Sequence, residues 1–293
     1  MTANISTLEQ LKALDLKTAD PNYIWELVNQ IGALPIMRSE YAKGKIFERA
    51  LSNRDGEPDF YQVSRMSFKP AHLNTNYQRA STPENTMFYG SVLKDQYTHD
   101  DVAYARITAC CEVSDLLRDN TILEGERIMT LGTWRLKNYI TCATIFDPSK
   151  TYTIDFLNEV KDAYIAKLES APKELREKGY AYLEFLASEF SKDVKKDQNH
   201  EYHISSQFSR VVSITGVDGI VYPSVRSAGL NLCIALHPRL MNELELIMVN
   251  KVHVIKKYGK VSIRYIGRCN VPENATEFKL LTMQEFKDSF GSL

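Results

Sequence analysis

The stretch Asp218-Gly-Ile-Val-Tyr-Pro-Ser-Val-Arg-Ser-Ala-Gly-Leu-Asn-Leu232 decides how the fold of this chain is interpreted. A short apolar strand runs into Pro223, presents Ser224, turns at Gly229 and resumes over residues 230–236. Because proline cannot donate a hydrogen bond to a sheet, we expect the strand pairing to be interrupted there. The interruption frees backbone groups and lets the Ser224 hydroxyl face a cleft. Taken alone, the segment is more simply a sharp strand–turn–strand without chemistry.

The composition limits the classes of function. The chain has 293 residues, of which 44% are hydrophobic and 25% charged, so it can form one large domain or two small ones with a sizeable core. A formal net charge of −1 argues against nucleic acid as the main partner, because phosphate binding needs a clustered positive surplus. No apolar run reaches the length of a membrane span, and the N-terminal region lacks the apolar centre of a signal peptide. The five cysteines have no CxxC spacing, so we expect reduced, buried thiols in a cytoplasmic protein.

Helices and strands are expected to alternate irregularly, which favours the α+β class. Residues 1–50 are expected to form a helical extension, with a capping box at Ser6 to Glu9 and a second helix that starts at Asp20 and Pro21 and ends at Gly32. Residues 51–293 are expected to form one catalytic domain with a helical insertion at about 150–200. Strands are expected at 60–67, 86–93, 127–136, 139–146, 220–225, 230–236, 246–255 and 261–269, and helices at 101–117, 155–168, 173–192 and 205–212.

Several well-known catalytic motifs are absent from the sequence. It contains no GxGxxG, no P-loop, no GxSxG and no HExxH. His200 and His203 have a spacing that could hold a metal on a helix, but their polar surroundings indicate a solvated turn, and we expect no metal site. Asp100 and Asp101 open a helix, where carboxylates complement the dipole, and are interpreted as caps.

Glu112 is the unusual residue of the predicted helix 101–117. At about 100° per residue, one apolar face contains Ala103, Ile107, Cys110, Cys111 and Leu117, and the opposite face places Glu112 among Ala105, Thr108, Ala109 and Leu116. We therefore expect a helix buried on both sides. A buried carboxylate is costly unless it is paired, so Glu112 is either an edge residue bonded to a neighbour or an acid held in a cleft to face developing positive charge.

Two arginines and two tyrosines precede this helix. Arg65 follows a predicted strand, and Arg79 lies in the turn-rich segment 76–85 ahead of another strand. Guanidinium groups at such positions can fork onto a pyrophosphate. Tyr77 and Tyr89 can stack on a flat ring. Each of these residues, taken alone, is more often a surface ion pair or a core aromatic.

The order of these motifs resembles the RES domain, a family named for its Arg, Glu and Ser. Arg65, the segment 76–91 with Arg79, Glu112 and Tyr222-Pro-Ser224 carry the likeness, and later stretches such as His203-Ile-Ser-Ser-Gln207 and Leu236-His-Pro resemble longer bacterial members. The likeness covers roughly residues 55–240. It implies an ADP-ribosyltransferase-like fold, a split mixed β-sheet around an NAD cleft, here with extra N-terminal helices.

The resemblance also implies a function. Members are typically toxins of toxin–antitoxin pairs that consume NAD by hydrolysis or phosphorolysis, or transfer ADP-ribose to a protein. We therefore expect an NAD glycohydrolase or phosphorylase that takes NAD as substrate without a metal and is plugged by an antitoxin or inhibitor protein. The catalytic residues would be Glu112, Arg65 and Ser224, and the residues that bind NAD would be Arg79, Tyr89, Tyr77 and Asn231.

Two alternatives remain open at this point: a mono-ADP-ribosyltransferase that modifies a protein, and a catalytically inactive RES-like binding module. The N-terminal helices and the insertion depart from the compact toxins, which leaves the antitoxin pairing open. A homodimer also fits the sequence.

Overall fold

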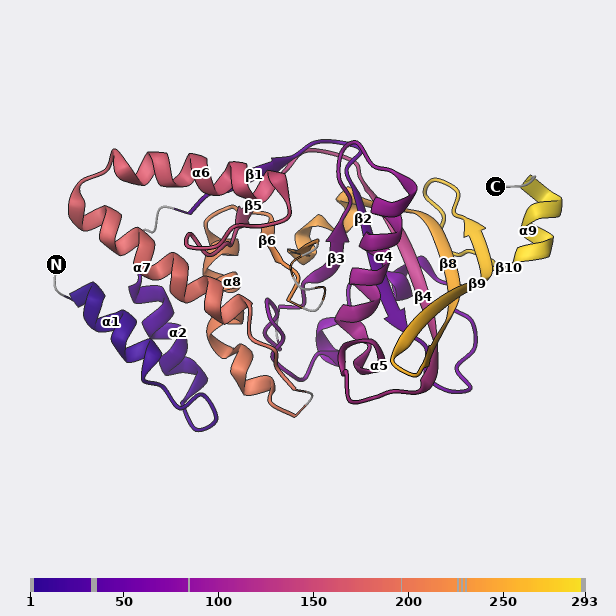
Figure 1. The fold of residues 1–293 in the computed structure, drawn as a ribbon, viewed down its shortest axis with the longest axis horizontal. Helices are drawn as coiled ribbons and strands as arrows, with labels where there is room; N and C mark the ends of the chain where they lie inside the picture. The colour runs from indigo at the N-terminus through magenta and orange to yellow at the C-terminus, as the bar shows by residue number, and fades with distance from the viewer. Residues whose placement is uncertain are drawn as a thin grey trace. The chain divides into compact units, whose positions relative to one another are not determined.

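The computed structural model describes residues 3–32, 36–83, 85–195, 197–225 and 231–290 together with Ser227 and Gly229, with side chains from residue 7 onward. Within these ranges the chain is a mixture of helices and strands, so the α+β class is confirmed (Figure 1). It divides into two compact units, each assembled from separate stretches of sequence. Unit 1 contains Met1–Tyr41, Lys69–Phe88 and Ile140–Pro238, and unit 2 contains Ala42–Phe68, Tyr89–Tyr139 and Arg239–Leu293.

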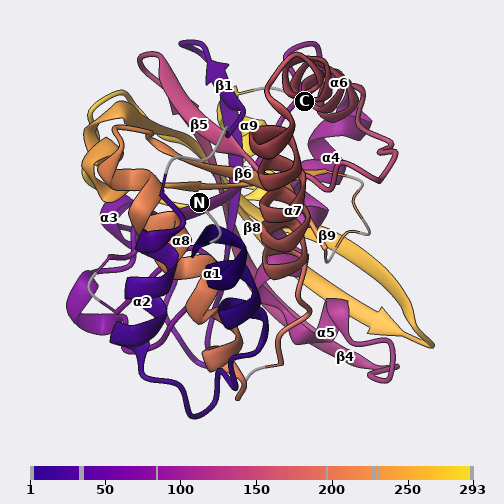
Figure 2. The ribbon, with the colours of Figure 1, turned by 90° about the vertical axis from the view of Figure 1, so that its left-hand side faces the viewer.

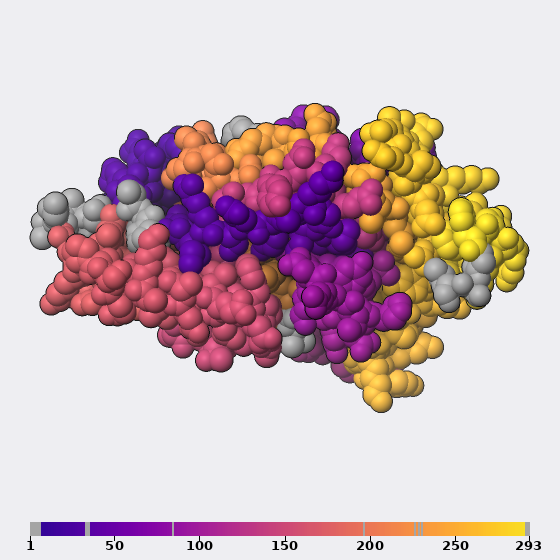
Figure 3. Space-filling model, turned by 90° about the horizontal axis from the view of Figure 1, so that it is seen from above, coloured from indigo at the N-terminus to yellow at the C-terminus, as the bar shows by residue number. Residues whose placement is uncertain are grey.

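Unit 1 combines a short mixed sheet with most of the long helices (Figure 2). Its strands lie in the order β1-β5-β6-β7, with β5 and β6 parallel and the two other pairs antiparallel. The strands are β1 (Arg38–Tyr41), β5 (Ile140–Thr144), β6 (Gly219–Pro223) and β7 (Leu232–Leu236). The helices are α1 (Ala3–Lys12), α2 (Pro21–Gln30), η1 (Ala71–Leu73), α6 (Asp155–Glu169), α7 (Lys173–Phe190), η2 (Asn199–Tyr202) and α8 (His203–Ile214). In Figure 3 the segment that contains α6 and α7 forms one continuous part of the surface of this unit.

Local sequence explains why the N-terminal helices begin and end where they do. Asp20 caps α2 by accepting a hydrogen bond from the backbone N–H of Asn22, and Pro21 occupies the first helical position, as predicted. Gly32 follows with φ of 68°, a conformation that favours glycine. The apolar stripe of α2 packs against α8. Helix α1 begins at Ala3, so the predicted capping box at Ser6 is wrong.

Unit 2 is built on an antiparallel sheet in the order β3-β2-β4-β8-β9-β10. Its strands are β2 (Ile46–Ser52), β3 (Phe88–Val92), β4 (Gly125–Leu136), β8 (Leu244–Lys257), β9 (Lys260–Asn270) and β10 (Leu281–Thr282). Its helices are α3 (Val63–Met66), α4 (His99–Val113), α5 (Asp115–Arg118), η3 (Pro238–Glu243) and α9 (Met283–Phe290). Helix α4 packs on the sheet over β2.

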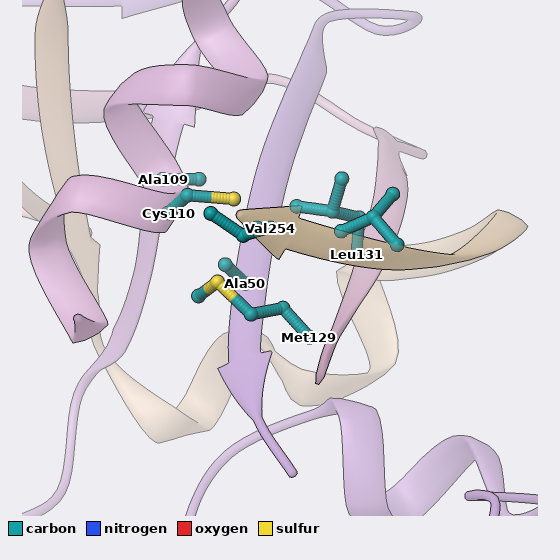
Figure 4. Close-up of a cluster of buried hydrophobic side chains, with 7 residues drawn as sticks. Ala50, Ala109, Cys110, Met129, Leu131 and Val254 are labelled. Atoms are coloured by element: carbon teal, nitrogen blue, oxygen red, sulfur yellow. The ribbon is translucent and has the colours of Figure 1, made fainter. Parts of the chain in front are cut away.

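The core beneath α4 is a cluster of small and branched side chains (Figure 4). Ala109 and Cys110 of the helix meet residues of three strands, namely Ala50, Met129, Leu131, Val252 and Val254. Burial raises the pKa of the Cys110 thiol to about 12, so this cysteine behaves as a small apolar residue, as the sequence predicted. All five cysteines are free, and Cys142 and Cys233 are also buried.

Three predicted elements differ from the structure. Residues 38–41 and 46–52 form the strands β1 and β2, although residues up to 50 were expected to be helical. The predicted strand at 60–67 is instead the single helical turn α3, preceded by an isolated bridge between Gln62 and Glu277. The predicted helix 101–117 is two helices, α4 and α5, separated at Ser114. In the part of the chain that the structure describes, no helix combines the length and the apolarity needed to cross a bilayer.

Candidate functional site

Ser224 sits at the start of the turn that the sequence predicted, but Pro223 still pairs with Leu232 of β7, so the expected interruption of the strand pairing at Pro223 is wrong. Strand β6 ends at Pro223, and the next residue, Ser224, is fully buried. Its N–H donates to the carbonyl of Asn231 (2.9 Å), and its own carbonyl accepts from the N–H of Gly229 (2.8 Å). Gly229 has φ of 74°, so the turn uses a conformation that favours glycine. The expected first residue of the returning strand, Leu230, lies outside the described residues, and β7 begins at Leu232.

The Ser224 turn forms one wall of a cavity of about 420 Å³ within unit 1. The other walls come from Phe146 and the loop 147–153 that follows β5, and from Phe190 at the end of α7. The hydroxyl of Thr153 donates to the carbonyl of Gly229 (3.4 Å), which links the two loops that border the cavity. A space of this size, with aromatic and polar lining, falls within the range of ligand pockets, roughly 300–1,000 Å³.

The polar side of this cavity is an ordered loop. Asp147 accepts hydrogen bonds from the N–H (3.0 Å) and hydroxyl (2.6 Å) of Ser149, and it lies 3.4 Å from the ammonium of Lys150. Burial alone would raise the pKa of Asp147, but these bonds and Lys150 outweigh it and lower the pKa. The hydroxyl of Tyr152 accepts from the N–H of Asp147 (2.7 Å). The loop therefore presents a carboxylate, an ammonium and an aromatic ring to the cavity.

Arg79 holds the end of helix α7. It is 5% exposed, and its guanidinium donates to the carbonyl of Phe190 through Nη1 and to that of Lys192 through Nη2 (2.9 Å). The same group lies over the rings of Tyr202 and Tyr222, at 5.3 and 5.7 Å. A cation that bonds the last carbonyls of a helix satisfies groups that have no intrahelical partner. The structure thus shows Arg79 supporting a cavity wall, where the sequence had suggested a pyrophosphate contact.

The two remaining predicted residues of unit 1 have local roles. The ring of Tyr77 packs edge-on against His203, with centroids 4.1 Å apart, and the side-chain Oδ1 of Asn231 accepts from the N–H of Leu232 (2.8 Å). His203 is buried, and its burial lowers its pKa, so the expected solvated turn is wrong at this residue. Among the described residues, no group of His, Cys, Asp and Glu side chains could hold a metal ion.

Arg65 and Tyr89 lie in unit 2, in different settings. Arg65 is exposed at the end of α3, where Nη2 lies 3.4 Å from Glu57 and the guanidinium stacks over Phe60 at 4.2 Å. Tyr89 is half-buried, and its carbonyl accepts from Nη1 of Arg49 (2.8 Å). Burial lowers the pKa of Arg49 to about 10. Arg49, which the sequence interpretation did not single out, therefore holds the backbone of the strand that carries Tyr89.

Glu112 is half-buried near the end of α4. Its backbone carbonyl accepts from Nη1 of Arg118 (3.4 Å). The buried residues of the helix are Ala105, Thr108, Ala109 and Cys110, while Ile107, which the sequence placed on one face with Cys110, is exposed. The prediction of a helix buried on both sides is therefore wrong, and Glu112 itself is half-buried.

Another acid of unit 2 is far more buried than Glu112. The carboxylate of Glu48, in β2, accepts from Nε of Arg106 (3.1 Å) and from the hydroxyl of Thr133 (2.9 Å). Burial raises the pKa of Glu48, and Arg106 opposes the shift. The sequence signal for this pair was two adjacent charged residues, Glu48 and Arg49, inside the segment 46–51, whose other residues are apolar.

The predicted residues thus fall into two groups. In unit 1, Ser224 and Asn231 are joined by a backbone hydrogen bond, and Arg79 bonds to Phe190, which lines the Ser224 cavity. In unit 2, Arg65, Tyr89 and Glu112 each contact different neighbours. Comparison of the chain with protein-family models gives no match, and comparison with curated proteins gives none either.

Proposed function

We propose that this chain degrades NAD by breaking the bond between nicotinamide and ribose, with the Ser224 cavity as the pocket for one end of the dinucleotide. The observation that carries the proposal is the position of Ser224. The sequence resemblance singled out this residue as functional, and it is buried at a strand end where it lines a cavity of ligand size.

The lining suits a nucleotide fragment. Phe146, Tyr152 and Phe190 offer apolar ring surface for a flat heterocycle, while Lys150 and the threonines of the loop offer donors to phosphate or ribose oxygens. The hydroxyl of Ser224 accepts a hydrogen bond from the N–H of Ser227 (3.2 Å), which orients the hydroxyl but does not remove its proton. We therefore assign Ser224 a binding role toward a ribose hydroxyl and not that of a nucleophile.

The departure of nicotinamide needs little acid catalysis, because nicotinamide leaves as a neutral molecule. Positive charge builds on the ribose, and a fixed carboxylate stabilises it where it develops. Glu112 stays the proposed carboxylate, and Arg65, Tyr89, Tyr77 and Asn231 stay predicted contacts of NAD. Arg79 is assigned a positioning role, because its donors already bond the end of α7.

The test is nicotinamide release from NAD by the purified chain, measured by chromatography. Glu112→Gln is expected to lower the rate by about a hundredfold or more, the scale of one lost electrostatic contact to a transition state. Ser224→Ala is expected to raise KM by about tenfold, the loss of roughly one hydrogen bond. Glu174→Gln, an exposed acid on α7, is the matched control and should leave turnover unchanged.

The products identify the acceptor. Labelled NAD incubated with cell lysate gives free ADP-ribose if water attacks, a phosphorylated sugar product if phosphate attacks, and labelled protein if the chain is a transferase. If the wild-type chain releases no nicotinamide at high concentration, the enzymatic proposal is wrong and the binding module is the better interpretation.

A further inference from the structure

Strand β9 is an edge of the unit 2 sheet over its first half. One side of the strand pairs with β8 along its length, whereas the short β10 reaches only Gly267 and Arg268 on the other side. Among the described residues, no strand pairs with that outer side between Lys260 and Ile266. In Figure 3 the tip of the β8–β9 hairpin protrudes from the surface. The proposed NAD chemistry uses none of these residues.

The hairpin turn determines which backbone groups of β9 face outward. Tyr258 and Gly259 form a two-residue turn, and positive φ at both positions, 51° and 74°, is typical of a type I′ turn. The flanking residues Lys257 and Lys260 then exchange hydrogen bonds, and along the strands bonded pairs alternate with non-bonded pairs. Every second residue of β9 therefore turns its N–H and C=O groups away from β8, namely Val261, Ile263 and Tyr265.

The same three residues give the edge an apolar face. Ile263 and Tyr265 lie opposite Val254 and Val252 of β8, which belong to the core cluster beneath α4. Ile263 packs against that cluster, whereas Val261 is 44% exposed and Tyr265 is 38% exposed. The outer side of β9 thus combines unpaired backbone groups with apolar side chains. An edge with both features is suited to the addition of another strand.

We propose that β9 pairs with β9 of a second copy of this chain, antiparallel and about a two-fold axis at Ile263. In this register Ile263 faces its own copy, and Val261 faces Tyr265 of the second copy. All three residues have outward backbone groups, so each pair exchanges two hydrogen bonds. A β-branched residue beside an aromatic ring is also a favourable pair across two strands. The interface is isologous, because each copy contributes the same residues.

Charge selects this register over its neighbours. The exposed Arg264 lies opposite Ser262 of the second copy, whose hydroxyl can accept from the guanidinium. A shift of two residues in one direction places Arg264 opposite itself, and a shift in the other direction places it opposite Lys260. Like charges directly opposite each other destabilise a sheet. The bulge at Ile266, the residue that β8 leaves unpaired, limits the pairing to the segment before it.

The experiment is sedimentation velocity of the full chain over a range of concentrations. Pairing of so short a segment buries less than the roughly 1,600 Å² of a standard interface, so we expect a reversible dimer with a Kd on the order of 10 µM. Val261→Pro removes an outward N–H but leaves the bonds to β8 in place, and it is expected to weaken dimerisation by about tenfold or more. Tyr258→Asn is the matched control, because Tyr258 is 85% exposed at the tip of the same hairpin and outside the proposed pairs, so the Kd should be unchanged.

A cysteine at the axis tests the register. Residues in a hydrogen-bonded antiparallel pair have Cα atoms about 5.5 Å apart, within the range of a disulfide. Mild oxidation of Ile263→Cys is therefore expected to give a covalent dimer on a non-reducing gel. Ser262→Cys, which lies on the other face and is offset from its own copy, should not cross-link. The wild type, with its five free cysteines, is the control for other disulfides.

Three results would each overturn the proposal. They are a wild-type chain that stays monomeric at about 200 µM, well above the expected Kd, an unchanged Kd in Val261→Pro, and no cross-link in Ile263→Cys. If circular dichroism shows that Val261→Pro is unfolded, the cross-link at Ile263 decides alone. These measurements need no NAD, so their outcome is independent of the proposed NAD chemistry.

Discussion

The stability of unit 1 should depend strongly on Arg79. Replacing it with alanine removes two charge-assisted hydrogen bonds to the carbonyls of Phe190 and Lys192, each worth roughly 1.5–3 kcal/mol. It also leaves buried carbonyls at the end of α7 without these donors, and it removes the cation from the faces of two tyrosine rings. We expect Arg79→Ala to lower the free energy of unfolding by about 3–5 kcal/mol, a large share of the roughly 5–15 kcal/mol of a typical domain.

The assay is urea denaturation followed by far-UV circular dichroism. Arg176→Ala is the matched control, because Arg176 makes an exposed ion pair with Glu169 (3.0 Å) that should contribute less than about 1 kcal/mol. Arg79→Lys keeps the charge but loses the planar fork, so it should fall between the two. If Arg79→Ala destabilises the chain no more than Arg176→Ala does, the assignment of Arg79 as the support of α7 is refuted.

Three further predictions concern particular contacts. Arg106→Met should destabilise the chain by about 3–5 kcal/mol in thermal or urea unfolding, because it leaves Glu48 buried without its partner, and a change below about 1 kcal/mol would contradict that pairing. Hydrogen bonds in the capping box lower the pKa of Asp101 to about 2 from 3.8. Its stabilising effect should therefore be present above pH 3.8 and disappear as the pH falls toward 2, so the difference in unfolding free energy between the wild type and Asp101→Asn should shrink over that range. Gly219→Ala should lower the free energy of unfolding by about 1–3 kcal/mol, because a Cβ there would lie 2.4 Å from the carbonyl oxygen of Ala235. An unchanged urea midpoint would show that β6 and β7 can move apart at this position without a cost in stability.

The elements with strong local signals were predictable. Asp20 and Pro21 fix the start of α2 because both act on the first turn alone. The apolar runs of β4 and β8 were long enough to give their type, and their bounds differ from the prediction by a few residues. Strand β1 was missed although Ser39 and Tyr41 alternate with exposed residues, because so short a run does not separate strand from helix.

The position of Glu112 shows what periodicity leaves undecided. The projection placed Cys110 with Ala103 and Ile107 and opposite Ala109, but Cys110 and Ala109 are buried together against the sheet, because the buried face is set by the strands beneath the helix. Ala105 and Ala109 are small enough for close packing on that sheet, so their face is the buried one. The exposed Ile107 could not be anticipated from the sequence of the helix alone.

The candidate site was predictable only where the signal is local. Pro223 and Gly229 mark the turn that buries Ser224, and both act within a few residues. The partner of Arg79 could not be found in this way, because Phe190 lies 111 positions further along the chain. The burial of Glu189 in α7 was also missed, because a glutamate in an amphipathic helix usually faces water.

The last turn of α7 separates two cavities of unit 1. Ala187, Phe190 and Ser191 line the Ser224 cavity, whereas Ser188, Glu189 and Lys192 line a second cavity of unit 1, of about 530 Å³, between α7 and α1. A rotation of this single turn that widens one space therefore changes the shape of the other. Coupling free energies are reciprocal, so if ligands bind on both sides of this turn, a ligand on either side would change the affinity of the other side by the same factor.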